Sequence, residues 1–197
     1  MYTLSFKMSF KHDNDSVYFA YCFPYTYSDC QNYLNKISCT ANKDCLRRSP
    51  LCKTIAGNDC EMLIITNFTS IPDVIATRPA IILTARVHPG ETNSSYIAEG
   101  VIDYLLSSDE GAKILRNRFV FKIVPMLNPD GVVVGNYRCS LSGFDLNRQW
   151  IAPNGRHFPE IKAVKQMIKS TAESREISFY CDFHGHSRAK SAFMYGC

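Results

Sequence analysis

The sequence lacks a long apolar segment, which removes one class of protein from consideration. No apolar run approaches the ~20 residues that a membrane-spanning helix needs. Residues 1–15, MYTLSFKMSFKHDND, alternate apolar and polar side chains and contain no continuous hydrophobic stretch. They therefore do not resemble a secretory signal, and we expect no membrane partner.

A dense basic tract is also absent. The 22 Lys and Arg residues exceed the 18 Asp and Glu residues by only 4, and they are dispersed along the chain. This distribution does not indicate nucleic-acid binding, although a mild positive charge is compatible with acidic substrates. With 46% hydrophobic and 20% charged residues, the 197-residue chain can bury the core of one domain, or most of one domain plus part of another.

Cysteine is abundant, but the CxxC pairs of common zinc modules are missing. The nine cysteines are Cys22, Cys30, Cys39, Cys45, Cys52, Cys60, Cys139, Cys181 and Cys197. No histidine lies among those from Cys22 to Cys60, so a second metal site there is not favoured. An odd count without a signal peptide indicates free thiols in a reducing compartment, and hence a cytoplasmic protein.

The first part of the chain predicts strands over 2–10 and 17–23, separated by the polar turn HDND. Two strands alone are marginal in water, so we interpret 1–24 as the last strands of an N-terminal β domain. SDCQNYLNKI predicts a short helix with Ser28 as its cap, and residues 40–60 are expected to form a connection.

Strand-like and helix-like patterns alternate in the rest of the chain. Strands are predicted over 61–68, 80–88, 119–127 and 177–184, helices over 94–108 and 159–174, and a turn at NPDG, 128–131. The residues expected to face inward are Ile97, Val101, Ile102, Leu105 and Leu106 on the first helix, and Ile161, Val164 and Ile168 on the second. This alternation predicts an α/β fold with a mixed, largely parallel sheet flanked by helices.

Two strand ends carry potential metal ligands. HPGE places His88 at the end of one strand and Glu91 at the start of the next helix, and Gly90 permits the tight turn between them. The later strand ends in DFHGH, which contains His184. Two histidines and a glutamate with one position left for water form the ligand set of a catalytic zinc site. Taken singly, each motif also fits a hydrogen-bonded structural histidine.

A third polar cluster lies between these motifs, in YRCSLSGFDLNRQW. Arg138, Asn147 and Arg148 lie here in a segment without apolar periodicity. Arginine forks suit recognition of a carboxylate or a developing oxyanion. The alternative is a solvated loop with surface ion pairs.

Together, HPGE, NPDGV, YRCSLSGFDLNRQW and YCDFHGHSRAKSAFMYGC resemble the cytosolic carboxypeptidases, the tubulin-deglutamylating branch of the zinc carboxypeptidase family. The resemblance covers roughly residues 23–197. It implies that 25–197 form the N-terminal portion of a catalytic domain that binds one zinc ion. The implied partners are glutamylated protein tails, above all of tubulin and microtubules, in the cytosol and at microtubules or cilia.

The resemblance also implies a role for each site residue. His88, Glu91 and His184 would be the zinc ligands, and His186 a neighbour with a structural hydrogen bond. Arg138 would polarise the scissile carbonyl and stabilise the oxyanion. Asn147 and Arg148 would hold the substrate's C-terminal carboxylate, and Asp145 would orient a zinc-bound histidine, although capping of the loop is an alternative for it.

One part of the family's machinery has no match in this sequence. The general-base glutamate of the family lies beyond the DFHGH strand, and no glutamate here occupies the matching position. We therefore expect the 197 residues to be a fragment that binds metal but has negligible turnover. Two other functions stay open: an N-acyl amino acid hydrolase of the same wider family, and a non-catalytic module that binds tubulin tails.

Overall fold

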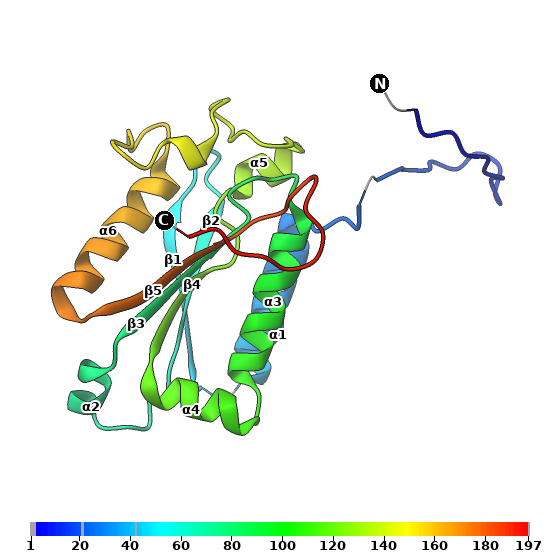
Figure 1. The fold of residues 1–197 in the computed structure, drawn as a ribbon. Helices are drawn as coiled ribbons and strands as arrows, with labels where there is room; N and C mark the ends of the chain where they lie inside the picture. The colour runs from blue at the N-terminus through cyan, green and yellow to red at the C-terminus, as the bar shows by residue number, and fades with distance from the viewer. Residues whose placement is uncertain (1–2, 21, 42, 197) are drawn as a thin grey trace.

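A five-stranded sheet forms the centre of the computed structural model, which describes residues 3–20, 22–41 and 43–196 (Figure 1). The strands are β1 (Leu46–Lys53), β2 (Asp59–Ile65), β3 (Ala80–Ala85), β4 (Val120–Val124) and β5 (Ile177–Phe183). Their order is β1-β2-β4-β3-β5. β3 is parallel to both β4 and β5, whereas β2 is antiparallel to both β1 and β4. The sheet is therefore mixed and flanked by helices, as predicted.

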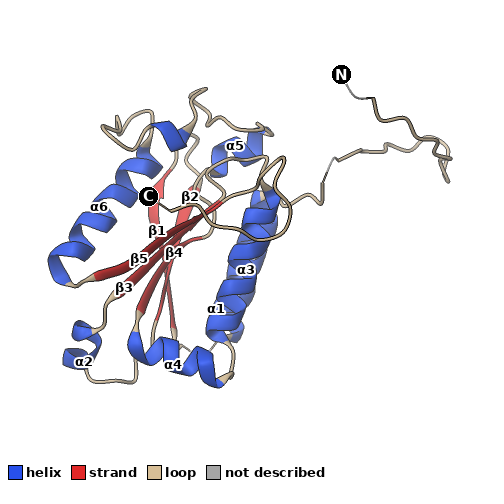
Figure 2. Cartoon of the chain, in the orientation of Figure 1, coloured by secondary structure: helices blue, strands red, loops and turns tan. Residues whose placement is uncertain are grey.

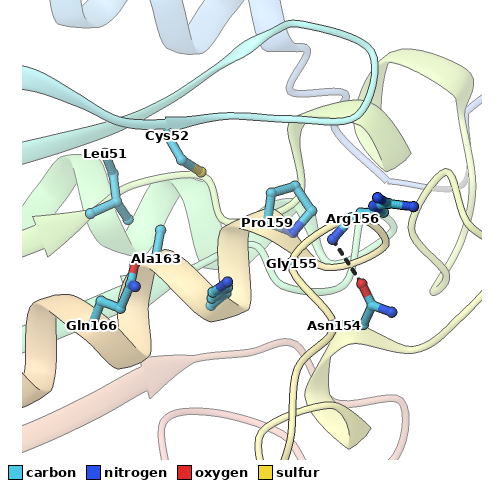
Figure 3. A pocket seen from close by; sticks show the side chains of 9 residues that line it. Leu51, Cys52, Asn154, Gly155, Arg156, Pro159, Ala163 and Gln166 are labelled. Atoms are coloured by element: carbon cyan, nitrogen blue, oxygen red, sulfur yellow. Dashed lines mark hydrogen bonds between the residues drawn. The ribbon is translucent and has the colours of Figure 1, made fainter.

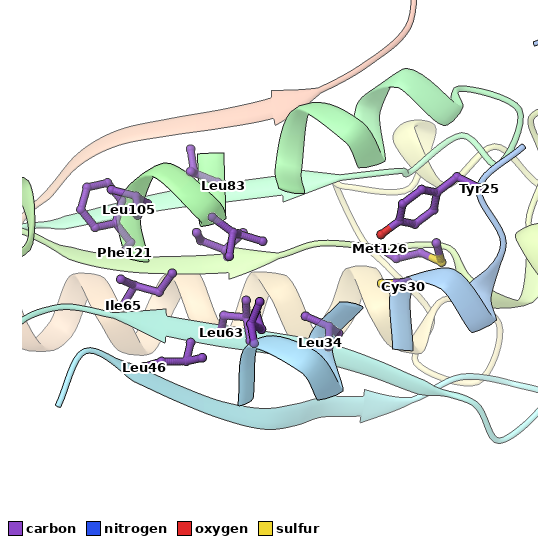
Figure 4. Close-up of a cluster of buried hydrophobic side chains, with 13 residues drawn as sticks. Tyr25, Cys30, Leu34, Leu46, Leu63, Ile65, Leu83, Leu105, Phe121 and Met126 are labelled. Atoms are coloured by element: carbon purple, nitrogen blue, oxygen red, sulfur yellow. The ribbon is translucent and has the colours of Figure 1, made fainter. Parts of the chain in front are cut away.

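Helices cover both faces of this sheet (Figure 2). They are α1 (Tyr27–Thr40), α2 (Pro72–Thr77), α3 (Thr92–Leu106), α4 (Glu110–Arg118), α5 (Pro129–Val134), the 3-10 helix η1 (Leu146–Arg148) and α6 (Pro159–Ser174). α1 and α3 pack with the sheet in one apolar cluster, shown in Figure 4, and α6 packs in a second. In β2, Leu63 belongs to the first cluster and Cys60 to the second, because alternate side chains of a strand point to opposite faces.

The first helix begins earlier than the sequence predicts. Its N-cap is Thr26, not Ser28. The Thr26 hydroxyl accepts a hydrogen bond from the Asp29 amide at 3.0 Å, and the Asp29 carboxylate accepts one from the Thr26 amide at 2.8 Å. This reciprocal capping box satisfies two donors at the helix start.

The prediction of a connection over 40–60 is wrong, because this segment contains β1 and the start of β2. β1 was missed because it is an edge strand whose sequence, LRRSPLCK, is largely polar. Edge strands tolerate charge and proline, since one side needs no ladder partner. Arg48 pairs with Glu61 of β2 at 2.7 Å, so polar side chains stabilise this hairpin.

The strands predicted over 2–10 and 17–23 are not formed in the described residues 3–20, 22 and 23. Tyr2 and Tyr21 lie outside the described residues. The segment extends away from the sheet (Figure 1), and an isolated pair of strands gains too little from pairing to form alone. The assignment of 1–24 to a β domain stays a prediction.

The predicted helix faces are correct in part. Ile102 and Leu105 of α3 are buried, and so are Ile161 and Val164 of α6, but Ile97 is 43% exposed. The first turn of α3 instead buries two serines that hold the neighbouring strand ends, as described below. Among the described residues, no helix is long and apolar enough to cross a bilayer.

Glu160, in the first turn of α6, generates a prediction for stability against pH. Its side chain is buried, and burial, together with the nearby Asp130, raises the pKa of Glu160 from 4.5 to about 7. The folded state therefore holds this proton at pH values where the unfolded chain has released it. Stability from this group falls as pH rises from about 4.5 to about 7.

Glu160→Gln should consequently raise the free energy of unfolding at pH 8 by roughly 2–3 kcal/mol and change it little at pH 4. Urea unfolding at both pH values measures this difference. Glu173→Gln, on the exposed side of the same helix, is the control for loss of a glutamate. Equal effects of the two substitutions at pH 8 would contradict the assignment.

Candidate metal centre

The HPGE turn follows β3 through an unusual backbone conformation. β3 ends at Ala85, and Arg86 adopts the left-handed region with φ 57°. This conformation reverses the chain but is unfavourable for a residue with a Cβ atom. His88 follows with only 3% of its surface exposed, and Glu91 is the N-cap residue of α3. The two side chains therefore stand on one strained turn.

The buried Arg86 side chain stabilises this turn. Its Nε donates to the carbonyl of Pro89 at 2.9 Å, which closes the turn on itself. Its Nη1 and Nη2 donate to Ser95 Oγ at 2.9 Å and to the Tyr25 carbonyl at 3.0 Å. A rigid guanidinium thus joins the turn to α3 and to the segment before α1.

Parallel pairing brings the end of β5 to the same place. Ala85 of β3 and Phe183 of β5 are register partners, so both strands end at one edge of the sheet. Ser94 of α3 donates from its hydroxyl to the Phe183 carbonyl at 2.6 Å and accepts from the Arg86 amide at 2.8 Å. The residue after Phe183, His184, is thereby held next to the HPGE turn.

The structure brings the three predicted ligands together. The Nδ1 atoms of His88 and His184 are hydrogen-bonded to the two carboxylate oxygens of Glu91, at 2.9 and 3.0 Å. The Gly185 amide also donates to Glu91 at 2.8 Å. One ligand atom from each of the three residues lies within 4.8 Å of the others, as a single metal ion requires. Two imidazoles and a carboxylate, without a thiolate, suit catalytic zinc.

Each histidine also contacts a carboxylate of its own through its Nε2 atom. His88 Nε2 lies 3.1 Å from Asp145 Oδ1, as the role predicted for Asp145 requires. His184 Nε2 lies 2.9 Å from Asp182 Oδ2, and Asp182 also accepts from the Thr84 hydroxyl at 2.7 Å. Such carboxylate–histidine pairs fix the ring orientation and the free nitrogen of a metal ligand.

The sequence reasoning missed Asp182. A signal was present, because side chains two residues apart on a strand point to the same face. An Asp two residues before a ligand histidine at a strand end is thus placed to contact its ring.

These contacts determine the charge of the site. Burial would raise the pKa of Glu91, but hydrogen bonds with His184, His88 and the Gly185 amide lower it to about 2. The hydrogen bonds of His184 with Asp182 and Glu91 raise its pKa to about 10. Metal binding therefore has to displace a proton from His184, and it weakens in acid.

The arginine-containing loop is attached directly to the HPGE turn. The Gly90 amide donates to the Tyr137 carbonyl at 2.7 Å, and a Cβ atom on Gly90 would lie 2.7 Å from that oxygen. Next to it, Arg138 Nε donates to Asp145 Oδ2 at 2.8 Å. The other oxygen of Asp145 accepts from the Asn147 amide at 2.8 Å, so Asp145 also caps the loop. Asp145 therefore contacts both the His88 ring and the loop backbone, and its role at a zinc-bound histidine stays a prediction.

Asn147 and Arg148 lie in η1. Trp150 Nε1 donates to Asn147 Oδ1 at 2.8 Å, which orients the Asn147 amide group. The exposed Arg148 guanidinium donates to the carbonyl of Asn147 at 3.2 Å. Asn147 thus joins the Asp145 network through its backbone, and the substrate roles of both residues stay predictions. His186 is exposed, and its Nδ1 accepts from two backbone amides, in keeping with a structural role.

The NPDG segment, residues 128–131, packs against the HPGE turn. It begins the short helix α5, with Asn128 as N-cap, instead of forming an isolated turn. Asn128 Nδ2 donates to the Val87 carbonyl at 3.0 Å. A Cβ atom on Gly131 would approach Pro89 to 2.5 Å, so only glycine allows this close packing. The family motif NPDGV therefore fixes the HPGE backbone.

Asp182→Asn should weaken zinc binding, because the amide keeps the shape but removes the charge that polarises His184. We expect the zinc dissociation constant to rise about 10–100-fold in competition with a chelating dye. The exposed Asp73→Asn is the matched control and should leave it unchanged. Equal zinc affinity in both variants would exclude a role for Asp182.

Arg86→Lys should also weaken zinc binding, since an ammonium group cannot reach the three acceptors that the guanidinium fork contacts. The expected loss is about tenfold or more. Arg116→Lys is a suitable control, because Arg116 is equally buried but donates to backbone carbonyls at the far end of α3. Arg116→Lys should leave zinc affinity unchanged, whatever it does to stability. A loss of the same size as in Arg86→Lys would show that Arg86 acts only through general stability.

Comparisons with known proteins agree with this geometry. A family model described as zinc carboxypeptidase matches residues 31–196. Cytosolic carboxypeptidase 2 is 50% identical over 198 residues in Xenopus tropicalis and 49% identical over 199 residues in Mus musculus. Both alignments cover 100% of this chain but only 20% and 23% of those relatives, so the chain spans about a fifth of their length.

A solved structure shares the fold. The metallo-carboxypeptidase from Burkholderia cenocepacia superposes with a TM-score of 0.73 and 28% identity, over 83% of this chain and 42% of that chain. The family match, the whole-length similarity and the shared fold lead to one conclusion. The chain belongs to the zinc carboxypeptidase family, and it is similar to the cytosolic carboxypeptidases over its whole length.

Proposed function

We propose that the protein is a zinc-dependent carboxypeptidase that removes C-terminal glutamates from glutamylated or acidic protein tails, those of tubulin in particular. One observation carries the proposal: Asp145 contacts both the metal-ligand candidate His88 and Arg138. A metal ligand and a cation for the oxyanion are thus oriented by one carboxylate. Family membership supports the peptidase chemistry, and the relatives' name supports a cytosolic location.

His88, Glu91 and His184 would hold the zinc ion, which supplies a Lewis acid for the scissile carbonyl and the attacking water when it is bound. Arg138 has a separate task. Asp145 anchors its Nε, and the guanidinium end can then donate to the oxygen on which negative charge develops. A preoriented donor of this kind stabilises the transition state more than the ground state.

Asn147 and Arg148 would bind the free C-terminal carboxylate of the substrate. Asn147 supplies amide donors oriented by Trp150, and Arg148 supplies an exposed guanidinium. Recognition of the free C-terminal carboxylate by these two residues would make the enzyme an exopeptidase. Selection of glutamate at that position rests on the resemblance to deglutamylating relatives, together with the net charge of +4.

The general base is proposed to come from residues outside this sequence. Within the described part of the chain, the carboxylates in contact with the metal-ligand histidines already have partners. Glu91 bridges both histidines, Asp145 holds His88 and Arg138, and Asp182 holds His184 and Thr84. We therefore expect residues 1–197 alone to bind zinc with negligible turnover.

The test measures glutamate release by the full-length protein from a peptide that ends in several glutamates. Release should stop with a chelator and with His88→Ala. It should also be absent from the same peptide with an amidated C-terminus, because the carboxylate that Asn147 and Arg148 bind is then lost. Arg138→Ala should lower kcat/KM by about 10²–10³-fold with zinc content unchanged, whereas the exposed Arg118→Ala should have no effect.

Other outcomes would identify the alternative functions. Undiminished release after His88→Ala would refute the metal assignment. Faster hydrolysis of N-acyl amino acids than of the peptide would favour an N-acyl amino acid hydrolase. Stoichiometric zinc with peptide binding but no cleavage by the full-length protein would favour a module that only binds acidic tails.

A further inference from the structure

Two cysteines lie directly opposite each other in the β1–β2 hairpin. Cys52 of β1 and Cys60 of β2 are register partners. The register shifts between Pro50 and Cys52, so Leu51 is an extra residue in β1. Without this bulge, Leu51 would face Cys60, and the two thiols would not be paired. The irregularity of the strand therefore creates the cysteine pair.

The register places the pair within reach of a disulfide. Directly opposed residues of antiparallel strands have Cα atoms about 4.5–5.5 Å apart. Disulfides join Cα atoms about 4.4–6.8 Å apart, so the backbone need not move far. Both side chains lie on the α6 side of the sheet, where Cys60 belongs to an apolar cluster and Cys52 packs against it. Both are free thiols in the structure.

The two thiols differ in their access to solvent. Cys60 is 0% exposed, whereas Cys52 is half-buried and lines an open pocket of about 640 Å³ (Figure 3). Arg156 and Lys162 line the same pocket, and the labelled Cys52 side chain in Figure 3 points from the strand toward α6. A small molecule that carries carboxylates can therefore reach Cys52 in a positively charged environment.

We propose that Cys52 and Cys60 form a dithiol modification site, which a carboxylate-bearing low-molecular-weight disulfide such as glutathione disulfide oxidises to a cross-strand disulfide. Cys52 is the entry thiol and Cys60 the resolving thiol. This inference does not rest on the proposed peptidase function, because it is drawn from the β1–β2 register and the pocket that Cys52 lines.

The reaction proceeds by two thiol–disulfide exchanges. The Cys52 thiolate attacks one sulfur of the small disulfide, whose S–S bond breaks and releases one small thiol after protonation. Cys60 then loses its proton to water and attacks the Cys52 sulfur of the mixed disulfide, which releases the second small thiol. In sum, two protein thiols are oxidised to one disulfide, and one small disulfide is reduced to two thiols.

The second exchange should be the slow one. The hydrogen bond with Cys52 and complete burial raise the pKa of the Cys60 thiol, so little of it is in the reactive thiolate form. The mixed disulfide on Cys52 should therefore appear first and decay as the intramolecular disulfide accumulates.

Trypsin makes the product easy to identify. Cleavage after Arg48, Lys53 and Arg86 places Cys52 in peptide 49–53 and Cys60 in peptide 54–86, each with a single cysteine. The purified protein is incubated with glutathione disulfide, quenched by alkylation, digested without reductant and analysed by mass spectrometry. We expect the linked pair 49–53/54–86 as the main intramolecular disulfide, and its loss on reduction.

Variants and denaturant provide the controls. Cys52→Ser should abolish both the mixed disulfide and the linked pair, and Cys60→Ala should leave the mixed disulfide on Cys52. The exposed Cys39→Ser should change neither. When the unsubstituted protein is oxidised in urea, disulfides should no longer form selectively between Cys52 and Cys60. This control tests the dependence on the fold without any substitution. The proposal is overturned if folded protein keeps only the mixed disulfide, or if its linkages are as unselective as in urea.

Discussion

The Glu91 carboxylate is the contact on which the candidate site depends. Its two oxygens join His88, at the end of β3, to His184, at the end of β5, and the Gly185 amide adds a third hydrogen bond. This arrangement needs two parallel strands that end together and a helix that begins between them. The mixed sheet supplies the first condition, and the strained turn at Arg86 supplies the second.

The charges of the site favour a divalent cation. Three carboxylates, from Glu91, Asp145 and Asp182, surround two histidines in a partly buried environment. Such a group is repulsive unless positive charge is present; Arg138 supplies part of it beside Asp145, and the raised pKa of His184 favours a proton as a further part. A zinc ion would provide more charge at the point where the histidine Nδ1 atoms converge. A bound cation would relieve the repulsion among the carboxylates, and this relief would add to the affinity of the site for metal.

The sequence predicted the parts of this site that follow from periodicity and strand ends. His88, Glu91 and the DFHGH histidines were candidates because apolar runs of strand length end at polar residues, and such ends meet in a parallel sheet. The family resemblance selected His184 over His186. The extent of α6, Pro159–Ser174, was also predicted correctly, since proline at its first position and a clear apolar face mark it.

The rest depended on tertiary contacts that local patterns do not record. β1 carries charged residues and a proline, which an edge strand tolerates, and its Arg48 side chain contacts both β2 and α1. Thr26, not Ser28, is the N-cap, although Ser28 also has a suitable partner, Gln31, three residues later, so the local pattern did not decide between the two. The strands predicted before residue 24 have alternating patterns but no partner sheet, and a pattern alone does not provide the pairing energy.

The β1–β2 hairpin, which lies largely in the segment predicted as a connection, helps to hold the HPGE turn. Its turn residues Thr54 and Ala56 donate to the buried Asp130 of α5 at 2.5 and 2.9 Å. At the start of the same short helix, Asn128 donates to the carbonyl of Val87, next to His88. One helix is thus bonded to the hairpin and to the HPGE turn, so the polar turn next to the cysteine pair contributes to the rigidity of the candidate metal site.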